Sequence, residues 1–463
     1  MNVNIHDEFL RLWEEIANFD ISEFAASLDP SDFPIPTLIP AGEGSGYVLS
    51  KAAVQALDAI ARQIHESKVD YQEAYSASDF LNLTSECVGT IISNLSDDKQ
   101  DWTANFELPL KEEIEARHSR KLTERIFFFG AILISPPEKL SIDIGPCRIV
   151  DRHQWLTEQL KQKLISSVSA RRIKRTWTGV KLRPTKNGKR NHTETAILKS
   201  IGKCDYVICV QTNGSSVKQM EERATQCARI ALLVVALFWQ RPSSPMENFT
   251  LAQDLNRRII YTGSIDVKRN LVICGSKSKH TFPHNAPTID WQNELPKLQP
   301  IFDVFGRALK TQCDHAPPKA TKEIYENIFQ VLTLIYRGSI EPEPLFATAL
   351  IGAAIDMLTG GKGSGGIAKL IEQQLGKSKN DALFSNGTTT GQFITKVYNI
   401  GRSRTLHGSN PELKKDWSEN RMQAEVICRI LLLQICDELH RDPNIVGLKH
   451  FMSKKNLAQA GSA

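Results

Sequence analysis

The pattern of apolar residues changes near residue 315, and this change limits the possible folds most strongly. Before it, short runs of β-branched and aromatic residues predict strands at residues 125–135, 141–150, 205–211, 258–261 and 270–274. After His315, Pro317 and Pro318 no run predicts a strand, and helical spacing predicts helices at residues 321–336, 344–358, 367–375, 390–406 and 411–440. We therefore predict an α+β protein, with a mixed α/β region over residues 1–315, an all-α bundle over residues 316–450 and a disordered tail over residues 451–463.

Further helices are expected in the mixed region near its N-terminus and at residues 51–67, 83–95 and 217–239, although the topology of this region does not follow from the pattern. At the other end of the chain, Asn410 can cap the final helix and Pro411 suits its first position.

Hydropathy and cysteine usage indicate the class of protein. The longest apolar run, residues 230–239, has ten residues, whereas a membrane-spanning helix needs about twenty. No secretory signal precedes the first helix. The nine cysteines form no C-x-x-C pair and predict no zinc site. We therefore expect a soluble cytoplasmic protein that does not bind a membrane and carries no metal and no cofactor.

One basic segment sets the sign of the net charge. Residues 159–193 contain no Asp or Glu but eleven of the 57 Lys and Arg residues, and without them 46 bases would face 52 acids. With Trp177 and His192 among them, these cations suit a phosphate backbone, which they would bind without reading its sequence. A solvated basic loop is the alternative. The candidate nucleic-acid-binding residues are Arg171, Arg172, Lys174, Arg175, Lys181, Arg183, Lys186, Lys189 and Arg190.

The segment TKVYNIGRSRTLHGSN, residues 395–410, carries the strongest chemical signal. In it Arg402 and His407 are separated by four residues, and the pattern resembles the R-x4-6-H signature of HEPN-domain ribonucleases. Tyr398, Arg402, Ser403, His407 and Gly408 resemble the form found in the Apea-like HEPN group of abortive-infection proteins. The resemblance covers roughly the last 145 residues, and it implies an endoribonuclease of prokaryotic anti-phage defence, with a phage-derived trigger as a possible partner.

Chance alone predicts about two R-x4-6-H matches in such a chain, and there are two. The second is Arg148 with His153. Context separates them, because Arg148 ends a predicted strand, whereas Arg402 lies late in a helix of the all-α region.

The chemistry of the first pair is coherent with RNA cleavage. RNA supplies its own nucleophile, the 2′-hydroxyl, so a site must deprotonate it, stabilise the charge on phosphorus and protonate the leaving oxygen. Histidine exchanges protons near neutral pH, and arginine presents a planar fork to two phosphate oxygens. This reaction needs no metal. Ser403 and Asn410 could bond the substrate or merely satisfy the backbone, and Arg404 is a possible further phosphate contact.

Helix geometry adds two expectations. Five α-helical residues leave Arg402 and His407 about 140° apart around the axis, so either the helix breaks near Leu406 and Gly408 or two chains build one cleft. The HEPN resemblance implies the latter, a homodimer through the helical domain. Asp356, the one acid of an apolar helix, is expected either to pair with Arg402 or to face solvent.

Two other functions compete with the ribonuclease. One is a non-catalytic nucleic-acid-binding or sensor protein that dimerises through its helical domain. The other is a nucleotide-dependent enzyme with GGKGSGG, residues 360–366, as its phosphate loop. That segment lacks the spacing of a phosphate-binding loop, and we expect it to be a flexible helix connection.

Overall fold

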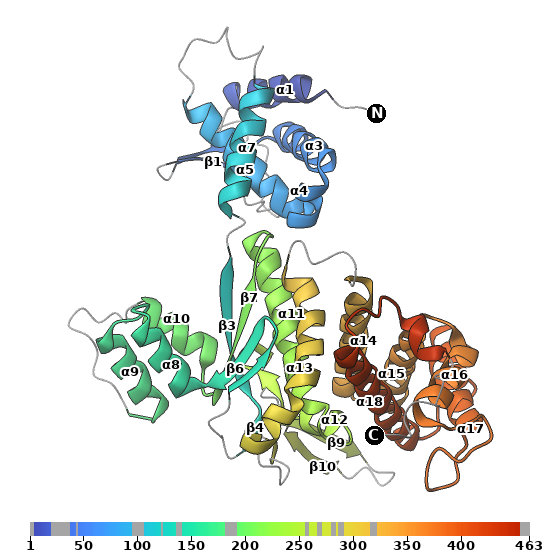
Figure 1. The fold of residues 1–463 in the computed structure, drawn as a ribbon. Coiled ribbons are helices and arrows are strands. Elements are labelled where there is room, and N and C mark those ends of the chain that lie inside the picture. Colours follow the sequence, from blue (N-terminus) through green and yellow to red (C-terminus); the bar gives the residue numbers. More distant parts are fainter. Residues whose placement is uncertain are drawn as a thin grey trace. The chain divides into compact units, whose positions relative to one another are not determined.

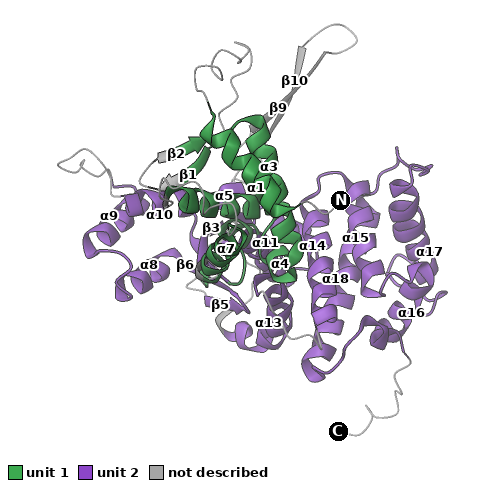
Figure 2. Ribbon diagram, turned by 90° about the horizontal axis from the view of Figure 1, so that it is seen from above, with its two compact units in different colours: residues 1–125, 213–222 green, residues 126–212, 223–463 purple. Residues whose placement is uncertain are grey.

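The computed structural model describes residues 4–19, 38–42, 45–94, 106–121, 124–135, 141–180, 192–254, 259–265, 271–278, 284–285, 291–314 and 322–453. The fold mixes α-helices and β-strands, as predicted. It divides into two compact units, one of residues 1–125 and 213–222 and one of residues 126–212 and 223–463 (Figure 2). The predicted boundary at residue 315 does not separate these units, because one core extends from Phe129 in the sheet to Phe451 beyond the last long helix.

Unit 1 is mainly helical. It contains α1 (Ile5–Ala17), a hairpin of β1 (Leu38–Gly42) and β2 (Ser45–Val48), α3 (Lys51–Ser67), α4 (Val69–Ala74), α5 (Ala77–Asn94) and α7 (Glu107–Lys121). Asn4 and Ser50 cap α1 and α3 through side-chain oxygens, as short polar residues do at helix N-termini. Gly89 lets β1 approach α5, because a Cβ there would lie 1.9 Å from the Pro40 carbonyl oxygen.

Unit 2 begins with a five-stranded sheet in the order β5-β6-β7-β3-β8. Its strands are β3 (Arg125–Ile132), β5 (Ser141–Ile144), β6 (Cys147–Asp151), β7 (Tyr206–Thr212) and β8 (Thr250–Leu251). Helix α11 (Val217–Ala236), with the apolar run at its end, is part of the same core, and Cys227 on it touches Cys313 of α13 (Trp291–Cys313). Helix α13 contacts both β5 and the bundle, which explains why the sheet and the bundle share a core.

The strands predicted before residue 315 are all present. Residues 125–135 form β3 and β4 (Ile134–Ser135), and the antiparallel pair β9 (Ile259–Ile265) and β10 (Leu271–Ser278) covers the last two predicted runs. The short strand β11 (His284–Asn285) pairs with β4, while α12 (Ser243–Met246) and a 3₁₀ turn, η1 (Ala252–Asp254), flank β8.

A lobe of three helices joins β6 to β7 (Figure 1). They are α8 (Arg152–Lys161), α9 (Ser167–Trp177) and α10 (His192–Ile201). Trp155, Ile173 and Ile197 pack with Val150 and Val207 of the sheet. The described part of the basic segment, residues 159–180 and 192–193, lies in this lobe and mostly on its helices.

The bundle follows in α14 (Lys322–Ile340), α15 (Pro344–Leu358), α16 (Gly363–Leu375), α17 (Thr390–Ile394), the π-helix η3 (Thr395–Arg404), α18 (Ser418–Arg441) and the 3₁₀ helix η4 (Leu448–Met452). Over residues 322–453 the structure has no strand, only one isolated bridge, as the pattern predicts. No single helix among the described residues is long and apolar enough to cross a membrane, although α15 and α16, bent by 71°, pass that test as a pair.

The predicted start of the last long helix and the predicted start of the tail are both wrong. Helix α18 begins at Ser418, not at Pro411, because the Asn410 side chain accepts a hydrogen bond from Glu412 N and holds residues 411–414 in turns. The predicted tail begins too early, since Phe451 is buried in the core and residues 451–453 are ordered by η4. Residues 454–463 lie outside the described residues.

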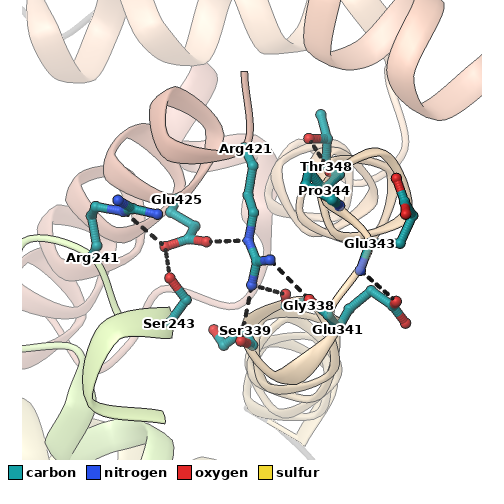
Figure 3. Close-up of polar contacts among 10 residues, drawn as sticks. All are labelled: Arg241, Ser243, Gly338, Ser339, Glu341, Glu343, Pro344, Thr348, Arg421 and Glu425. Carbon is teal, nitrogen blue, oxygen red and sulfur yellow. Dashed lines mark hydrogen bonds and ion pairs between the residues drawn. The ribbon is translucent and has the colours of Figure 1, made fainter. Parts of the chain in front are cut away.

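A buried ionic cluster connects α18 to α12 and to the C-terminal end of α14 (Figure 3). The fully buried Glu425 carboxylate accepts hydrogen bonds from Arg421 Nε at 2.8 Å and Ser243 Oγ at 2.6 Å. Arg421 also donates to the carbonyl oxygens of Gly338, Ser339 and Glu341, at the C-terminal end of α14. One guanidinium thus neutralises a buried acid and satisfies carbonyls that the end of a helix leaves unpaired.

Candidate functional site

The motif segment is wound as a π-helix and ends in a defined cap. Thr389 and Gln392 form a capping box that starts α17, and η3 continues it through Arg404. The helix then closes with Ser409 N donating to Arg404 O and Gly408 N to Thr405 O, while Gly408 has φ +69°. This is a Schellman motif, in which the glycine adopts the left-handed conformation that stops the helix. The helix therefore breaks near Leu406 and Gly408, as in the first of the two alternatives, while the dimer that the HEPN resemblance implies stays a prediction.

Glycines bring the π-helix close to α15. A Cβ on Gly352 of α15 would lie 3.1 Å from Val397 O, and one on Gly401 of η3 would lie 3.1 Å from both Thr348 and Trp417. The resulting close approach places the last turn of α15 beside the motif. π-Helical turns are rare and occur frequently at functional sites.

Asp356, near the end of α15, is the centre of the site. The residue is 6% exposed. Its Oδ1 accepts a hydrogen bond from Gly363 N, the first residue of α16, at 2.8 Å. Its Oδ2 lies 3.8 Å from Arg402 Nη2 and accepts a hydrogen bond from the Tyr398 hydroxyl at 3.2 Å. The expected pairing of Asp356 with Arg402 is confirmed, and the solvent-facing alternative is wrong.

Arg402 is held from two sides and remains partly accessible. Its guanidinium carbon lies 5.3 Å from the centre of the Tyr398 ring, a cation–π distance. Its side chain is 30% exposed, and Nε is buried without a hydrogen-bond partner in the described structure. Burial and the neighbouring Asp356 charge raise the pKa of Tyr398, so its phenol stays protonated and donates to Asp356. A guanidinium fixed in this way keeps donors for an anion arriving from solvent.

His407 lies at the C-cap of the same helix and is exposed. Its backbone N donates to Ser403 O at 3.1 Å, which fixes the backbone from which the imidazole projects. Within the described residues no hydrogen bond or ion pair joins it to Arg402. The structure therefore brings Asp356, Tyr398 and Arg402 together and leaves the imidazole free toward solvent.

The remaining motif residues have different surroundings. Arg404 is exposed and Ser403 half-buried, and both contribute backbone carbonyls to the helix end. Asn410 is buried and bonds Thr405 Oγ1 at 2.8 Å and Glu412 N at 2.7 Å. Of the two roles considered for Asn410, the structure shows the second, because its carbonyl and amide groups hold the turn after the motif.

The second Arg–His match is structural. Arg148 forms a two-point ion pair with Glu158, at 2.9 and 2.8 Å. His153 packs edge-on against Trp177, and burial lowers its pKa. Neither side chain is available to a ligand in the way that Arg402 and His407 are.

The predicted nucleic-acid-binding residues divide into three groups. Arg171, Lys174 and Arg175 are exposed on α9. Arg172 is different, because its Nε donates to the buried Glu194 carboxylate at 2.9 Å, which gives it a structural partner that the other three lack among the described residues. The others lie outside the described residues; they are Lys181, Arg183, Lys186, Lys189 and Arg190.

The glycine-rich segment connects α15 to α16, as expected, and includes the first turn of α16. Gly360, Gly361 and Gly363 have φ between 65° and 75°, and Lys362 N donates to Thr359 Oγ1. Gly361 N also donates to the Asp356 carbonyl oxygen, and Gly363 N donates to the Asp356 side chain, which binds the connection directly to the site. Sequence reasoning missed this contact, since it joins a backbone N–H to a side chain from another helix.

Sequence reasoning also missed a polar cavity of about 900 Å³ elsewhere in unit 2. Its walls include Arg229, Tyr336, Arg337, Ser339 and Arg421, and none of the predicted site residues lines it. The described residues contain no group of three or more His, Cys, Asp or Glu side chains suited to a metal ion. No family model, curated protein or solved structure is detectably similar to this chain.

Proposed function

We propose that the chain is a metal-independent, HEPN-type endoribonuclease that cleaves RNA by attack of the 2′-hydroxyl on the adjacent phosphorus. The observation that carries the proposal is the contact of Asp356, Tyr398 and Arg402 in an all-α bundle, with an exposed His407 at the end of the same helix. The site thus offers a held cation and, five residues further along the chain, an exposed proton-transfer group, and such a cleavage needs both.

Each side chain has a distinct role in this reaction. Arg402 binds the non-bridging phosphate oxygens and stabilises the charge that grows on them. Asp356 and Tyr398 act as positioning residues, because they hold the guanidinium that binds the phosphate. His407 moves the proton, either from the 2′-hydroxyl or to the leaving 5′-oxygen.

A homodimer through the helical domain supplies both proton transfers. A single chain offers one histidine at this site, whereas two motifs facing each other across a twofold axis offer two, one as base and one as acid. Leu406 and Leu413, which flank the exposed histidine, are 63% and 60% exposed and suit an apolar interface. A role in prokaryotic abortive-infection defence, with a phage-derived trigger, follows from the motif resemblance alone. The cytoplasm is the expected compartment.

The second candidate is a non-catalytic RNA-binding protein that dimerises through the same bundle. The basic exposed face of α9 favours it, because that face does not depend on the Arg402 site. Both candidates bind RNA, and only the first cuts it.

The test compares wild type, His407→Ala and Arg402→Ala on total bacterial RNA in excess EDTA. His440→Ala is the matched control, because His440 is also exposed in the last turn of a helix. Cleavage by wild type and His440→Ala, and loss of at least about 100-fold in the other two, supports the nuclease. Equal cleavage by all four would show a contaminating enzyme or another site, and no cleavage by any would favour the binding protein.

A further inference from the structure

The α8–α10 lobe has a one-sided charge distribution. All four acids between residues 147 and 205 are engaged within the lobe or with the sheet beneath it. Asp151 caps α8, while Glu158, Glu194 and Asp205 pair with Arg148, Arg172 and Arg152 respectively. The cations that face solvent therefore have no acid to neutralise them in the described part of the lobe.

Three of these cations form one face of α9. Arg171, Lys174 and Arg175 are spaced i, i+3 and i+4, so they lie within about one third of the helix circumference. Ser169 and Ile173, which are buried, lie on the opposite face and fix its orientation. Lys161, Lys163, Lys199 and Lys203 are also exposed and have no ion pair among the described residues.

A cavity of about 680 Å³ opens where α9 ends. Trp177, Arg152, Lys203 and Leu198 line it together with the α9 end residues Thr176 and Thr178. The guanidinium of Arg152 stacks 5.3 Å from the centre of the Trp177 ring and is itself held by the Lys203 and Cys204 carbonyl oxygens. The indole is thus a fixed aromatic wall at the end of a row of cations.

We propose that this lobe binds single-stranded RNA, with consecutive phosphates on the α9 cations and one unpaired base against Trp177 in the cavity. Cations that follow the backbone, combined with an aromatic wall for a base, are the recurring means of binding single strands without reading their sequence. The inference takes RNA as the ligand from the proposed function, but it requires no cleavage. The site would hold substrate away from Arg402 and His407.

The binding test uses the full chain with His407→Ala, in EDTA, so that no RNA is cut. Fluorescence anisotropy measures the Kd for a labelled RNA of about 20 nucleotides, longer than typical single-strand sites, from about 50 to 200 mM salt. The triple variant Arg171→Gln, Lys174→Gln and Arg175→Gln should weaken binding at least about tenfold and reduce the salt slope by about 2, since each single-strand phosphate contact contributes about 0.7. The control replaces three exposed lysines of the bundle, Lys369, Lys377 and Lys449, by Gln and should keep the wild-type slope.

A second measurement isolates the base contact. An abasic oligonucleotide keeps the phosphates and loses the bases, so the parent protein should bind it about tenfold more weakly than RNA. Trp177→Leu, checked for an unchanged unfolding temperature, should bind both about equally. Should Trp177→Leu prove unfolded, Thr178→Leu at an exposed position of the same cavity narrows it with an aliphatic side chain and should also reduce the difference between the two ligands.

Several results would overturn the inference. An unchanged salt slope in the α9 triple variant would show that the α9 cations do not bind the RNA phosphates. A base preference that survives both cavity variants would show that no base lies against Trp177. Binding to vesicles of anionic lipid but not to RNA would make the lobe a membrane-surface site, since Leu164 and Val168 are exposed beside its cations. RNA binding by the wild type without any cleavage would refute the nuclease and leave this inference standing.

Discussion

Asp356→Asn perturbs the candidate site with the least change in shape. The amide keeps an oxygen for Gly363 N but removes the charge that faces Arg402 Nη2 at 3.8 Å. At that distance and an effective dielectric constant of about 20, the attraction between unit charges is about 4 kcal/mol. Since the Arg402 side chain is 30% exposed, water and desolvation reduce the net contribution to about 1–2 kcal/mol.

The variant also weakens the start of α16. The hydrogen bond from Gly363 N changes from charge-assisted to neutral, and the N-terminus of α16 loses a favourable negative charge. We therefore expect the free energy of unfolding to fall by about 2 kcal/mol. Cleavage of RNA should fall about tenfold, because Arg402 is no longer held in one orientation.

Urea unfolding followed by circular dichroism measures the first effect. A double-mutant cycle with Arg402→Gln isolates the pair and should return a coupling of about 1 kcal/mol. Glu372→Gln is the control, because Glu372 is an exposed acid on α16 outside the site. A coupling indistinguishable from zero, together with unchanged cleavage, would refute the reasoning that Asp356 positions Arg402.

Three further predictions concern other contacts. Glu425→Ala should lower the free energy of unfolding by about 3–5 kcal/mol, because it leaves Arg421 buried without its acid; a loss below about 1 kcal/mol in urea unfolding would contradict this. Tyr398→Phe should reduce kcat/KM for RNA about fivefold by removing the hydrogen bond to Asp356, and Tyr398→Ala should reduce it further by removing the ring beneath Arg402; equal effects of the two would show that the ring contributes nothing. His153→Gln should flatten the pH dependence of the free energy of unfolding. Burial lowers the pKa of His153 in the folded state, so folding favours the neutral imidazole. The stability that His153 contributes is therefore present above the usual histidine pKa of about 6.5 and is lost as the pH falls below it. Thermal unfolding of the wild type and of His153→Gln from about pH 7 to pH 5 measures this effect. If the unfolding temperatures of the two proteins fall in parallel with pH, His153 is not the source of the pH dependence.

Local spacing predicted the elements whose apolar faces are regular. Helix α15 has the predicted bounds, and the predicted strands before residue 315 are present. Burial of one face of an element gives its apolar residues a regular spacing, which can be recognised in the sequence. Helix α9 was not predicted, since its buried face consists only of Ser169, Ala170 and Ile173 among many cations. The start of α16 at Gly363 was missed as well, because its stabilising acid comes from α15.

The site was only partly predictable for the same reason. An acid in an apolar helix must find a partner, and this argument correctly suggested Arg402 for Asp356. The π-helical winding of residues 395–404 left no signal in the apolar spacing, and the close contacts of Gly401 there are with Thr348 and Trp417, which lie in other elements of the bundle. The turn held by Asn410 likewise depends on Thr405, five residues away across the helix end.

The product ends of cleaved RNA test the central claim most directly. Attack by the 2′-hydroxyl leaves a 2′,3′-cyclic phosphate or its 2′- or 3′-phosphate hydrolysis product on one fragment and a 5′-hydroxyl on the other. Mass spectrometry of the fragments made in EDTA should find these ends with wild type, and no fragments with His407→Ala or with a 2′-O-methylated RNA of the same sequence. Fragments with 3′-hydroxyl and 5′-phosphate ends, or cleavage of the methylated RNA, would contradict the proposed mechanism.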